Sequence, residues 1–272
     1  MYIDSHAHIF FKEFSEDFAD VLRRSKEAGV SAIIVPGTDL DTSRQAVALA
    51  EAHDEVYACV GFHPHDAEEA SDESLGQIEE LSRHQKVVAI GEIGLDFFYD
   101  YSPRERQVEV LRKQLAIAVR RNLPVVIHTR DSVPESLEEI KSISEKHREW
   151  RSSGYEKGPV QGARGVFHCF SGTAEQARTL FSNGFFVSYP GIVTFRNSSV
   201  LETLKLIGYG SILLETDSPF LAPVPLRGKR NEPANIPLIA NKIAEVLQTT
   251  PSVIAESASA NTRHLFSLPR TV

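Results

Sequence analysis

Six histidine and acidic residues with the chemistry of metal ligands are distributed along this chain of 272 residues, and each follows a short apolar run. Imidazole and carboxylate together suit zinc, manganese or a similar ion, whereas an oxygen-only cage would favour magnesium or calcium. Six protein ligands are too many for one hydrolytic ion that keeps open positions. They match two ions about 4 Å apart that share a bridging carboxylate and together polarise a phosphoryl oxygen. The six candidates are His6, His8, Glu92, His128, His168 and Asp217.

The apolar runs before these residues predict buried strands. Runs of four to six apolar, mostly β-branched residues are typical of strands covered on both faces of a parallel sheet. We therefore expect the candidate ligands at the carboxyl ends of strands, on one rim of the fold. The predicted strands are the run that begins at Tyr2, Ala32–Val35, Tyr57–Val60, Lys86–Ile90, Val125–Ile127, Val166–Phe167, Phe185–Val187 and Ile212–Leu214.

Segments with apolar residues at three- and four-residue spacing separate the strands and predict helices. The alternation predicts the α/β class and a TIM-like (β/α)8 barrel, for which about 250 residues are typical, so residues 1–272 are expected to form one domain. A last helix and tail, 251–272, are expected to pack outside the barrel, and Trp150–Gly165 is expected to be an irregular loop. The predicted helices are Glu16–Gly29, Thr42–His53, Ser74–His84, Pro103–Asn122, Pro134–Trp150, Ala174–Asn183, Ser198–Ile207, Ile236–Gln248 and Pro251–Phe266.

The composition, with 42% hydrophobic and 24% charged residues, is that of a soluble globular protein. No apolar span approaches the roughly 20 residues that a membrane helix needs, so no membrane partner is expected. The first strand carries Asp4 and His6, and a cleavable signal there would remove the site. Two cysteines, Cys59 and Cys169, favour a reducing compartment over a disulfide framework, so we expect a cytoplasmic location. The oligomeric state is left open.

The net charge of −8 by itself argues against a polyanionic partner. Two divalent ions would halve that charge and concentrate positive charge where a phosphate would lie. A basic segment, Arg227–Arg230, follows the eighth predicted strand. Such a segment is usually a solvated loop, but here it belongs to the rim that carries the candidate ligands.

Each histidine also has a structural interpretation, because a single histidine after an apolar run is more often a core or surface residue than a ligand. The pair His6 and His8 is a stronger signal, since alternate residues of a strand point the same way. By the same alternation, Asp4 is expected to orient a ligand histidine. The histidines on predicted helices are interpreted as structural: His53, His84, His147 and His264.

The motifs around these residues resemble those of one family, the TatD family of metal-dependent deoxyribonucleases. The resemblance runs in order along most of the chain. Its motifs are Asp4–His8, Gly61–His65, Ala89–Asp96, Pro124–Asp131, Phe167–Gly172, Leu214–Pro223 and Arg227–Asn235.

This resemblance implies a TIM-like barrel that hydrolyses DNA phosphodiester bonds, commonly as a 3′ to 5′ exonuclease on single strands or 3′ ends, and a connection to DNA repair. It also implies two divalent ions, Zn, Mn or Mg. Glu92 would bridge them, with His128 and His168 on the second ion. On the first ion, Glu92 would be joined by His6, His8 and Asp217.

The stretch Trp150–Gly165 departs from the family pattern by its length.

Two residues are assigned catalytic roles. Beside a metal at the end of the eighth strand, Asp217 can take a proton from the attacking water. Glu92 would act structurally and electrostatically. Three further residues are candidates for binding phosphate oxygens, with second-layer packing or a solvated loop as the alternative interpretation of each: His63, Arg130 and Arg230.

Two other functions are compatible with parts of this pattern. The same barrel with a His-x-His motif serves amide and ester hydrolases of the amidohydrolase superfamily. Those enzymes commonly bridge their metals with a modified lysine at the fourth strand, where this chain has Glu92. A non-catalytic nucleic-acid-binding protein is the second alternative, although binding alone needs no hydrolytic ligand set.

Overall fold

The computed structural model describes residues 1–151, 160 and 162–269, so most of the predicted Trp150–Gly165 loop lies outside the described residues. The chain divides into two compact units. Unit 1 comprises Met1–Val35, Cys169–Arg178 and Val187–Val272, and unit 2 comprises Pro36–His168 and Thr179–Phe186.

Unit 1 contains strands from both ends of the chain. Strand β1 (Tyr2–Asp4) pairs in parallel with β2 (Val30–Pro36), and β7 (Phe185–Tyr189) pairs in parallel with β8 (Ile212–Leu214). The last strand also returns to the first, since the backbone N–H of Ser5 donates to Leu214 O at 2.9 Å. Beyond the strand ends, Ala7 and Ser218 continue this pairing as a parallel bridge. The pairing of the eighth strand with the first is the one that a (β/α)8 barrel requires.

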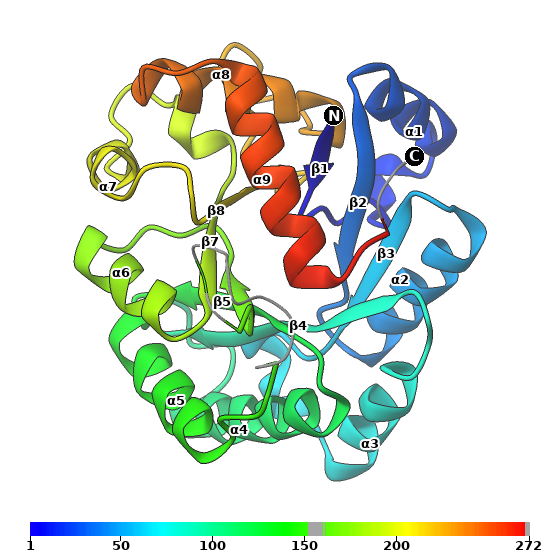
Figure 1. Ribbon diagram of the computed structural model, residues 1–272. Helices are drawn as coiled ribbons and strands as arrows, with labels where there is room; N and C mark the ends of the chain where they lie inside the picture. The colour runs from blue at the N-terminus through cyan, green and yellow to red at the C-terminus, as the bar shows by residue number, and fades with distance from the viewer. Residues whose placement is uncertain (152–159, 161, 270–272) are drawn as a thin grey trace. The chain divides into compact units, whose positions relative to one another are not determined.

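Unit 1 also contains the whole of α1 (Phe18–Glu27), α7 (Val200–Ile207), α8 (Ile236–Val246) and α9 (Pro251–Phe266). Helix α9 has the predicted bounds and lies beside β1 (Figure 1). The Asn261 side-chain amide donates to the carbonyls of Gly210 and Ile212, and the Ser259 hydroxyl donates to Met1 O. These carbonyls lie at the amino ends of β8 and β1. Helix α9 is therefore at the opposite end of these strands from His6 and Asp217.

Unit 2 carries four strands that pair in parallel in chain order: β3 (Val56–Val60), β4 (Val87–Asp96), β5 (Val125–Arg130) and β6 (Gly165–Phe167). Every residue of β4 is buried, as expected for a parallel strand covered on both faces. The helices of unit 2 are α2 (Leu40–Ala52), α3 (Asp72–Leu81), α4 (Arg104–Arg121) and α5 (Val133–Lys146). Helix α6 (Ala174–Ser182) contributes residues to both units. Short 3-10 segments occupy Lys12–Phe14, Pro64–Glu69, Gly191–Thr194 and Pro233–Asn235.

Two strands of unit 2 are longer than their apolar runs predict. Strand β4 continues past Ile90 to Asp96, and β5 continues past Ile127 to Arg130, so Glu92 and His128 lie within strands and not after them. The expectation that every ligand follows its strand was wrong for these two. Gly94 explains the extension, because it pairs with His128 at a φ of 148° and a Cβ there would overlap the His128 carbonyl oxygen. Only glycine lets β4 run on beside β5 at this point.

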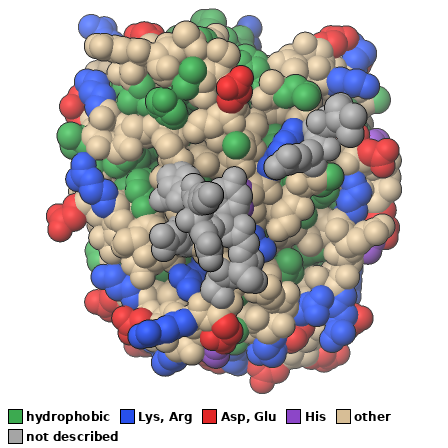
Figure 2. All heavy atoms as spheres, viewed as in Figure 1, with side chains coloured by type: hydrophobic (Ala, Val, Ile, Leu, Met, Phe, Trp, Pro, Cys, Tyr) green, Lys and Arg blue, Asp and Glu red, His purple; other side chains and the backbone are tan. Residues whose placement is uncertain are grey.

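The outer surfaces of the unit 2 helices carry ion pairs between neighbouring helices. Arg120 of α4 pairs with Glu79 of α3 at 2.6 Å, and Arg112 of α4 pairs with Glu139 of α5 at 2.6 Å. Figure 2 shows basic and acidic side chains interspersed on the face that it presents. Among the described residues, no helix combines the length and apolar character needed to cross a membrane.

Candidate metal centre

In unit 2, one carboxylate oxygen is surrounded by imidazole nitrogens. Glu92 Oε1 lies 2.8 Å from His168 Nε2, 3.0 Å from His128 Nδ1 and 3.5 Å from His63 Nε2. The two nearer nitrogens, His128 Nδ1 and His168 Nε2, are 3.2 Å apart. The carboxylate itself is almost completely buried, with 4% of its side chain exposed.

A second carboxylate, that of Asp96 at the end of β4, holds the other side of the His128 ring. Asp96 Oδ2 lies 3.0 Å from His128 Nε2 and 2.9 Å from His65 Nε2. With Nε2 turned to Asp96, the ring directs Nδ1 toward Glu92. A carboxylate that fixes a ligand histidine in this way sets the ring orientation and raises the basicity of the ligand nitrogen.

Asp96 and His65 are residues that the sequence interpretation missed. A signal was present, because Glu92, Gly94 and Asp96 alternate along β4 and alternate residues of a strand share a face. Likewise His65 is two residues from His63, and the backbone N–H of His65 donates to His63 Nδ1 at 3.1 Å.

The pKa values of His128 and His63, two of the three imidazoles near Glu92, are shifted in opposite directions. Burial lowers the pKa of His128, but hydrogen bonds to Asp96 and Glu92 outweigh it and raise the pKa to about 9. The pKa of His63 is lowered well below its ordinary value. Burial is the largest cause, and the charge of the neighbouring His128 is the next. His63 is therefore neutral near pH 7, and because its Nδ1 accepts from His65, its proton is on Nε2. The carboxylates around His128 create a negative environment that a divalent cation would neutralise.

In unit 1, the pairing of β8 with β1 brings three of the predicted ligands together. His6 Nε2 and His8 Nε2 are 3.1 Å apart, and Asp217 Oδ1 lies 3.8 Å from the first and 3.7 Å from the second. The Asp217 backbone N–H donates to His6 O at 2.9 Å. Asp217 adopts a φ of 55°, a left-handed conformation that is uncommon outside glycine and is enriched at functional sites. This group also has the mixed nitrogen and oxygen donors of a transition-metal site.

Asp4 is held where β1 and β8 pair. Its Oδ1 accepts from the backbone N–H groups of His6 and Thr216 at 3.2 and 2.9 Å, and its Oδ2 accepts from the Thr216 hydroxyl at 2.5 Å. These contacts fix the backbone on both sides of the β1–β8 pairing. That Asp4 also orients a ligand histidine stays a prediction. Burial raises the pKa of Asp4 to about 7 against the effect of these bonds.

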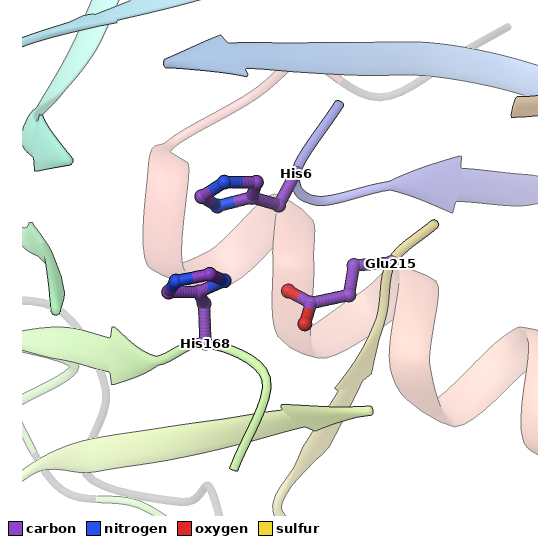
Figure 3. Close-up of side chains that lie close together, drawn as sticks. All are labelled: His6, His168 and Glu215. Atoms are coloured by element: carbon purple, nitrogen blue, oxygen red, sulfur yellow. The ribbon is translucent and has the colours of Figure 1, made fainter. Parts of the chain in front are cut away.

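Glu215 is a further buried carboxylate that the sequence interpretation missed. Its Oε1 accepts from the Cys169 backbone N–H and its Oε2 from the Ser188 hydroxyl, both at 2.6 Å, and burial raises its pKa well above the ordinary value. Figure 3 shows that Glu215 extends from the segment after β8 and His6 from the segment after β1, with His168 following β6. Glu215 alternates with Asp217, which is the signal that could have identified it.

The two arginines proposed to bind phosphate have different surroundings. Arg230 Nη1 and Nη2 donate to the Asp17 carboxylate at 2.7 and 2.8 Å, so a phosphate would compete with this ion pair. The Arg130 guanidinium lies over the rings of Phe98 and Tyr99, with its Cζ 4.1 and 4.6 Å from their centroids. In the described part of the chain, no carboxylate pairs with Arg130. Of the two, Arg130 is the more available to a ligand.

Comparisons with known proteins give one consistent result. The model of the TatD related DNase family matches residues 3–267. An uncharacterized metal-dependent hydrolase of Bacillus subtilis, YabD, is 40% identical over 269 residues, which cover 98% of this chain and all of that protein. The 3′-5′ ssDNA/RNA exonuclease TatD of Escherichia coli is 32% identical over 271 residues, which cover 97% of this chain and 98% of the relative.

A solved structure supports the fold. The crystal structure of YjjV, a TatD homolog from Escherichia coli, superimposes with a TM-score of 0.88 at 33% identity and covers 98% of both chains. The predicted TIM-like (β/α)8 fold class is thereby confirmed. The prediction of one domain over residues 1–272, with 251–272 outside the barrel, stays a prediction.

Proposed function

Since the chain belongs to the TatD related DNase family and is a metal-dependent hydrolase, as its motifs predicted, we propose that it hydrolyses the phosphodiester bonds of single-stranded DNA from the 3′ end. The observation that carries the proposal is the convergence of two imidazole nitrogens, His168 Nε2 and His128 Nδ1, on Glu92 Oε1 at 2.8 and 3.0 Å. A buried carboxylate encircled by imidazoles is a donor set built for a cation, and hydrolysis of a phosphodiester is a reaction that such cations promote.

We propose that two divalent ions bind. The donor atoms form two groups. In unit 1, Asp217 Oδ1 lies within 3.8 Å of His6 Nε2 and His8 Nε2, and in unit 2 the second group surrounds Glu92. His6, His8 and Asp217 would hold one ion and His128 and His168 the second, with Glu92 bridging. When bound, such ions supply a Lewis acid for the phosphoryl oxygen and make the attacking water more acidic.

Asp217 is proposed to accept the proton of the attacking water at its carboxylate. Its side chain is 15% exposed, so water reaches it, whereas that of Glu92 is 4% exposed and enclosed by imidazoles. Glu92 is accordingly proposed to act through its charge and its ligand role. The Nε2–H of His63 and the guanidinium of Arg130 are proposed as donors to non-bridging phosphate oxygens, Arg130 in the two-pronged geometry that suits phosphate.

The barrel architecture and one relative support the proposed direction and substrate. A barrel mouth surrounded by βα loops admits the end of a single strand more readily than the middle of a duplex. The TatD relative of Escherichia coli carries the name of a 3′-5′ ssDNA/RNA exonuclease, which supports attack from the 3′ end and extends the candidate substrates to RNA. The cytoplasmic location and the connection to DNA repair stay predictions.

The test uses one single-stranded oligonucleotide labelled at the 5′ end in one reaction and at the 3′ end in another, each with Mg²⁺, Mn²⁺ or Zn²⁺. We expect the 5′-labelled strand to shorten stepwise and the 3′-labelled strand to release a labelled mononucleotide at once. Efficient nicking of closed circular duplex DNA without release of mononucleotides would contradict attack from the 3′ end. Binding without turnover under any metal would favour a non-catalytic nucleic-acid-binding protein.

The role of Asp217 is tested in the same assay with Asp217→Asn. The amide keeps an oxygen ligand but cannot accept the proton, so we expect metal and DNA to bind while turnover slows by roughly 10²- to 10⁴-fold. Asp131→Asn is a matched control, because Asp131 is an exposed aspartate with a similar φ of 54°. Near-native turnover of Asp217→Asn at saturating metal, or a defect that added metal repairs, would show that Asp217 is a ligand alone.

A further inference from the structure

A group of aromatic side chains directly follows β4 in unit 2 and is open to solvent. Phe98 is 56% exposed and Tyr101 is 64% exposed, although large aromatic side chains normally bury their rings. The rings of Tyr99 and Tyr101 stack with centroids 5.2 Å apart and an interplanar angle of 26°. Exposed apolar side chains that cluster, unlike scattered ones, mark a surface with a binding role.

A cation is held against this group. The segment pairs with the end of β5, where the backbone N–H of Phe97 donates to Arg130 O at 2.8 Å. This pairing sets the planar guanidinium of Arg130 over Phe98 and Tyr99, at 4.1 and 4.6 Å. Because no carboxylate of the described residues pairs with Arg130, its charge is available to an anion next to the rings.

The same segment is anchored to the candidate metal centre. Asp96 Oδ1 accepts from the backbone N–H groups of Phe98 and Tyr99 at 3.0 and 3.2 Å, while its Oδ2 faces the imidazoles of His65 and His128. The ring of His65 also lies edge-on to that of Tyr101, with centroids 4.8 Å apart. One carboxylate therefore positions both a predicted metal ligand and the aromatic segment.

We propose that Phe98, Tyr101 and Arg130 form a stacking subsite that binds the nucleobases of a single-stranded oligonucleotide beside the scissile phosphate. The proposal rests on the proposed function and adds to it the basis of strand selection. Every base has a π-face, so binding to exposed rings tolerates any sequence. The bases of a duplex already stack on one another, so only an unpaired strand offers faces to the protein.

The charge around the subsite indicates that stacking on the bases contributes more to binding than electrostatic attraction of the oligonucleotide's phosphate backbone. Asp100 and Asp131 are the chain neighbours of Tyr101 and Arg130, so the segment has no basic excess. Oligonucleotide binding that depends on the rings should therefore change little with salt, in contrast to binding through many phosphate contacts.

The decisive variants are Tyr101→Leu and Tyr101→Phe. Leucine keeps an apolar side chain but removes the π-face, whereas phenylalanine keeps the ring. The probes are a single-stranded oligonucleotide and the same strand with abasic tetrahydrofuran residues at its 3′ end. For the base-bearing strand we expect Tyr101→Leu to raise KM by roughly 5- to 100-fold at near-native kcat, the usual loss for one stacked base. Tyr101→Phe should stay near the wild type, and on the abasic strand the two variants should be equal.

An exposed aromatic outside the subsite, Tyr209 at 36% exposure, provides the control variant Tyr209→Leu, which should leave both substrates unaffected. Losses by Tyr101→Leu that are the same on base-bearing and abasic strands would overturn the subsite. A KM of Tyr101→Leu equal to that of the wild type on both strands would also overturn the subsite.

A binding arm separates this proposal from the proposed function. Fluorescence anisotropy of the labelled base-bearing oligonucleotide in the presence of a chelator measures affinity without turnover. Weaker binding by Tyr101→Leu than by Tyr101→Phe supports the subsite even if no phosphodiester is hydrolysed. Equal binding by the two variants overturns it even if the enzyme proves to be a nuclease.

Discussion

Asp96 Oδ2 lies 3.0 Å from Nε2 of His128, on the opposite side of the imidazole from the nitrogen that faces Glu92. The same oxygen is 2.9 Å from His65 Nε2. A carboxylate that was absent from the predicted ligand set therefore determines how a predicted ligand is presented.

We expect Asp96→Asn to lower metal affinity or activity by roughly 10- to 100-fold, the usual effect of losing the partner that orients a ligand histidine. An amide cannot accept from both imidazoles with the strength of a carboxylate. Isothermal titration with Mn²⁺ or Zn²⁺ measures the change, and Asp100→Asn, four residues further along, is the control. Unchanged affinity and turnover in Asp96→Asn would mean that His128 needs no such support.

How much of this site the sequence could predict depends on the residue. His6 and His8 follow a strand and alternate, and the prediction that they project together agrees with the 3.1 Å between their Nε2 atoms. Glu92 and His128 were predicted as ligands, but their place inside strands depends on the close approach of Gly94 to the His128 backbone. That approach is a tertiary contact, and apolar runs carry no information about it.

The residues that were missed are those whose role is to hold another residue. Asp96 and Glu215 each alternate with a predicted ligand, but so do many buried strand residues. What distinguishes them is their partners, His128 for Asp96 and Ser188 for Glu215, and those partners come from other strands. In contrast, helix α9 was predicted with its observed bounds, because its start and period are local properties of the chain.

Two glycines provide a matched test of the strand geometry. Gly94→Ala would place a Cβ against the His128 backbone in a left-handed conformation, so we expect strong destabilisation and loss of metal binding. Gly76 lies in α3, and apart from its chain neighbours and the backbone of its own helix no atom lies within 4 Å of an added Cβ. We therefore expect Gly76→Ala to stabilise the protein by about 0.5–1 kcal/mol. Urea unfolding of both variants checks the pair. A Gly94→Ala variant as stable as the wild type would show that β4 and β5 do not approach as described.

The ion pairs around Asp17 predict how stability depends on pH. Hydrogen bonds first from Arg230 and then from Arg24 hold the pKa of Asp17 well below its ordinary value of 3.8. A carboxylate whose pKa is depressed in the folded state contributes stability that is fully present above the unfolded-state pKa. This stability is lost as the pH falls from the unfolded-state pKa through the folded-state pKa. We therefore expect Asp17→Asn to have a lower Tm than the wild type at pH 6, and the gap to narrow from about pH 4 downwards.

Thermal unfolding of both proteins between pH 6 and pH 3 measures this gap. Asp20→Asn, which disrupts the exposed pair with Arg23, should change Tm little at any pH. A gap between wild type and Asp17→Asn that stays constant down to pH 3 would show that the charge of Asp17 contributes nothing to it.

The central claim is that six ligands form one centre for two ions, and anomalous X-ray scattering from crystals grown at saturating Mn²⁺ or Zn²⁺ tests it most directly. Two anomalous peaks are expected about 4 Å apart, with Glu92 between them. His6, His8 and Asp217 should contact one peak, and His128 and His168 the other. A single peak at saturating metal, or a second peak that contacts none of these side chains, would contradict a two-ion centre.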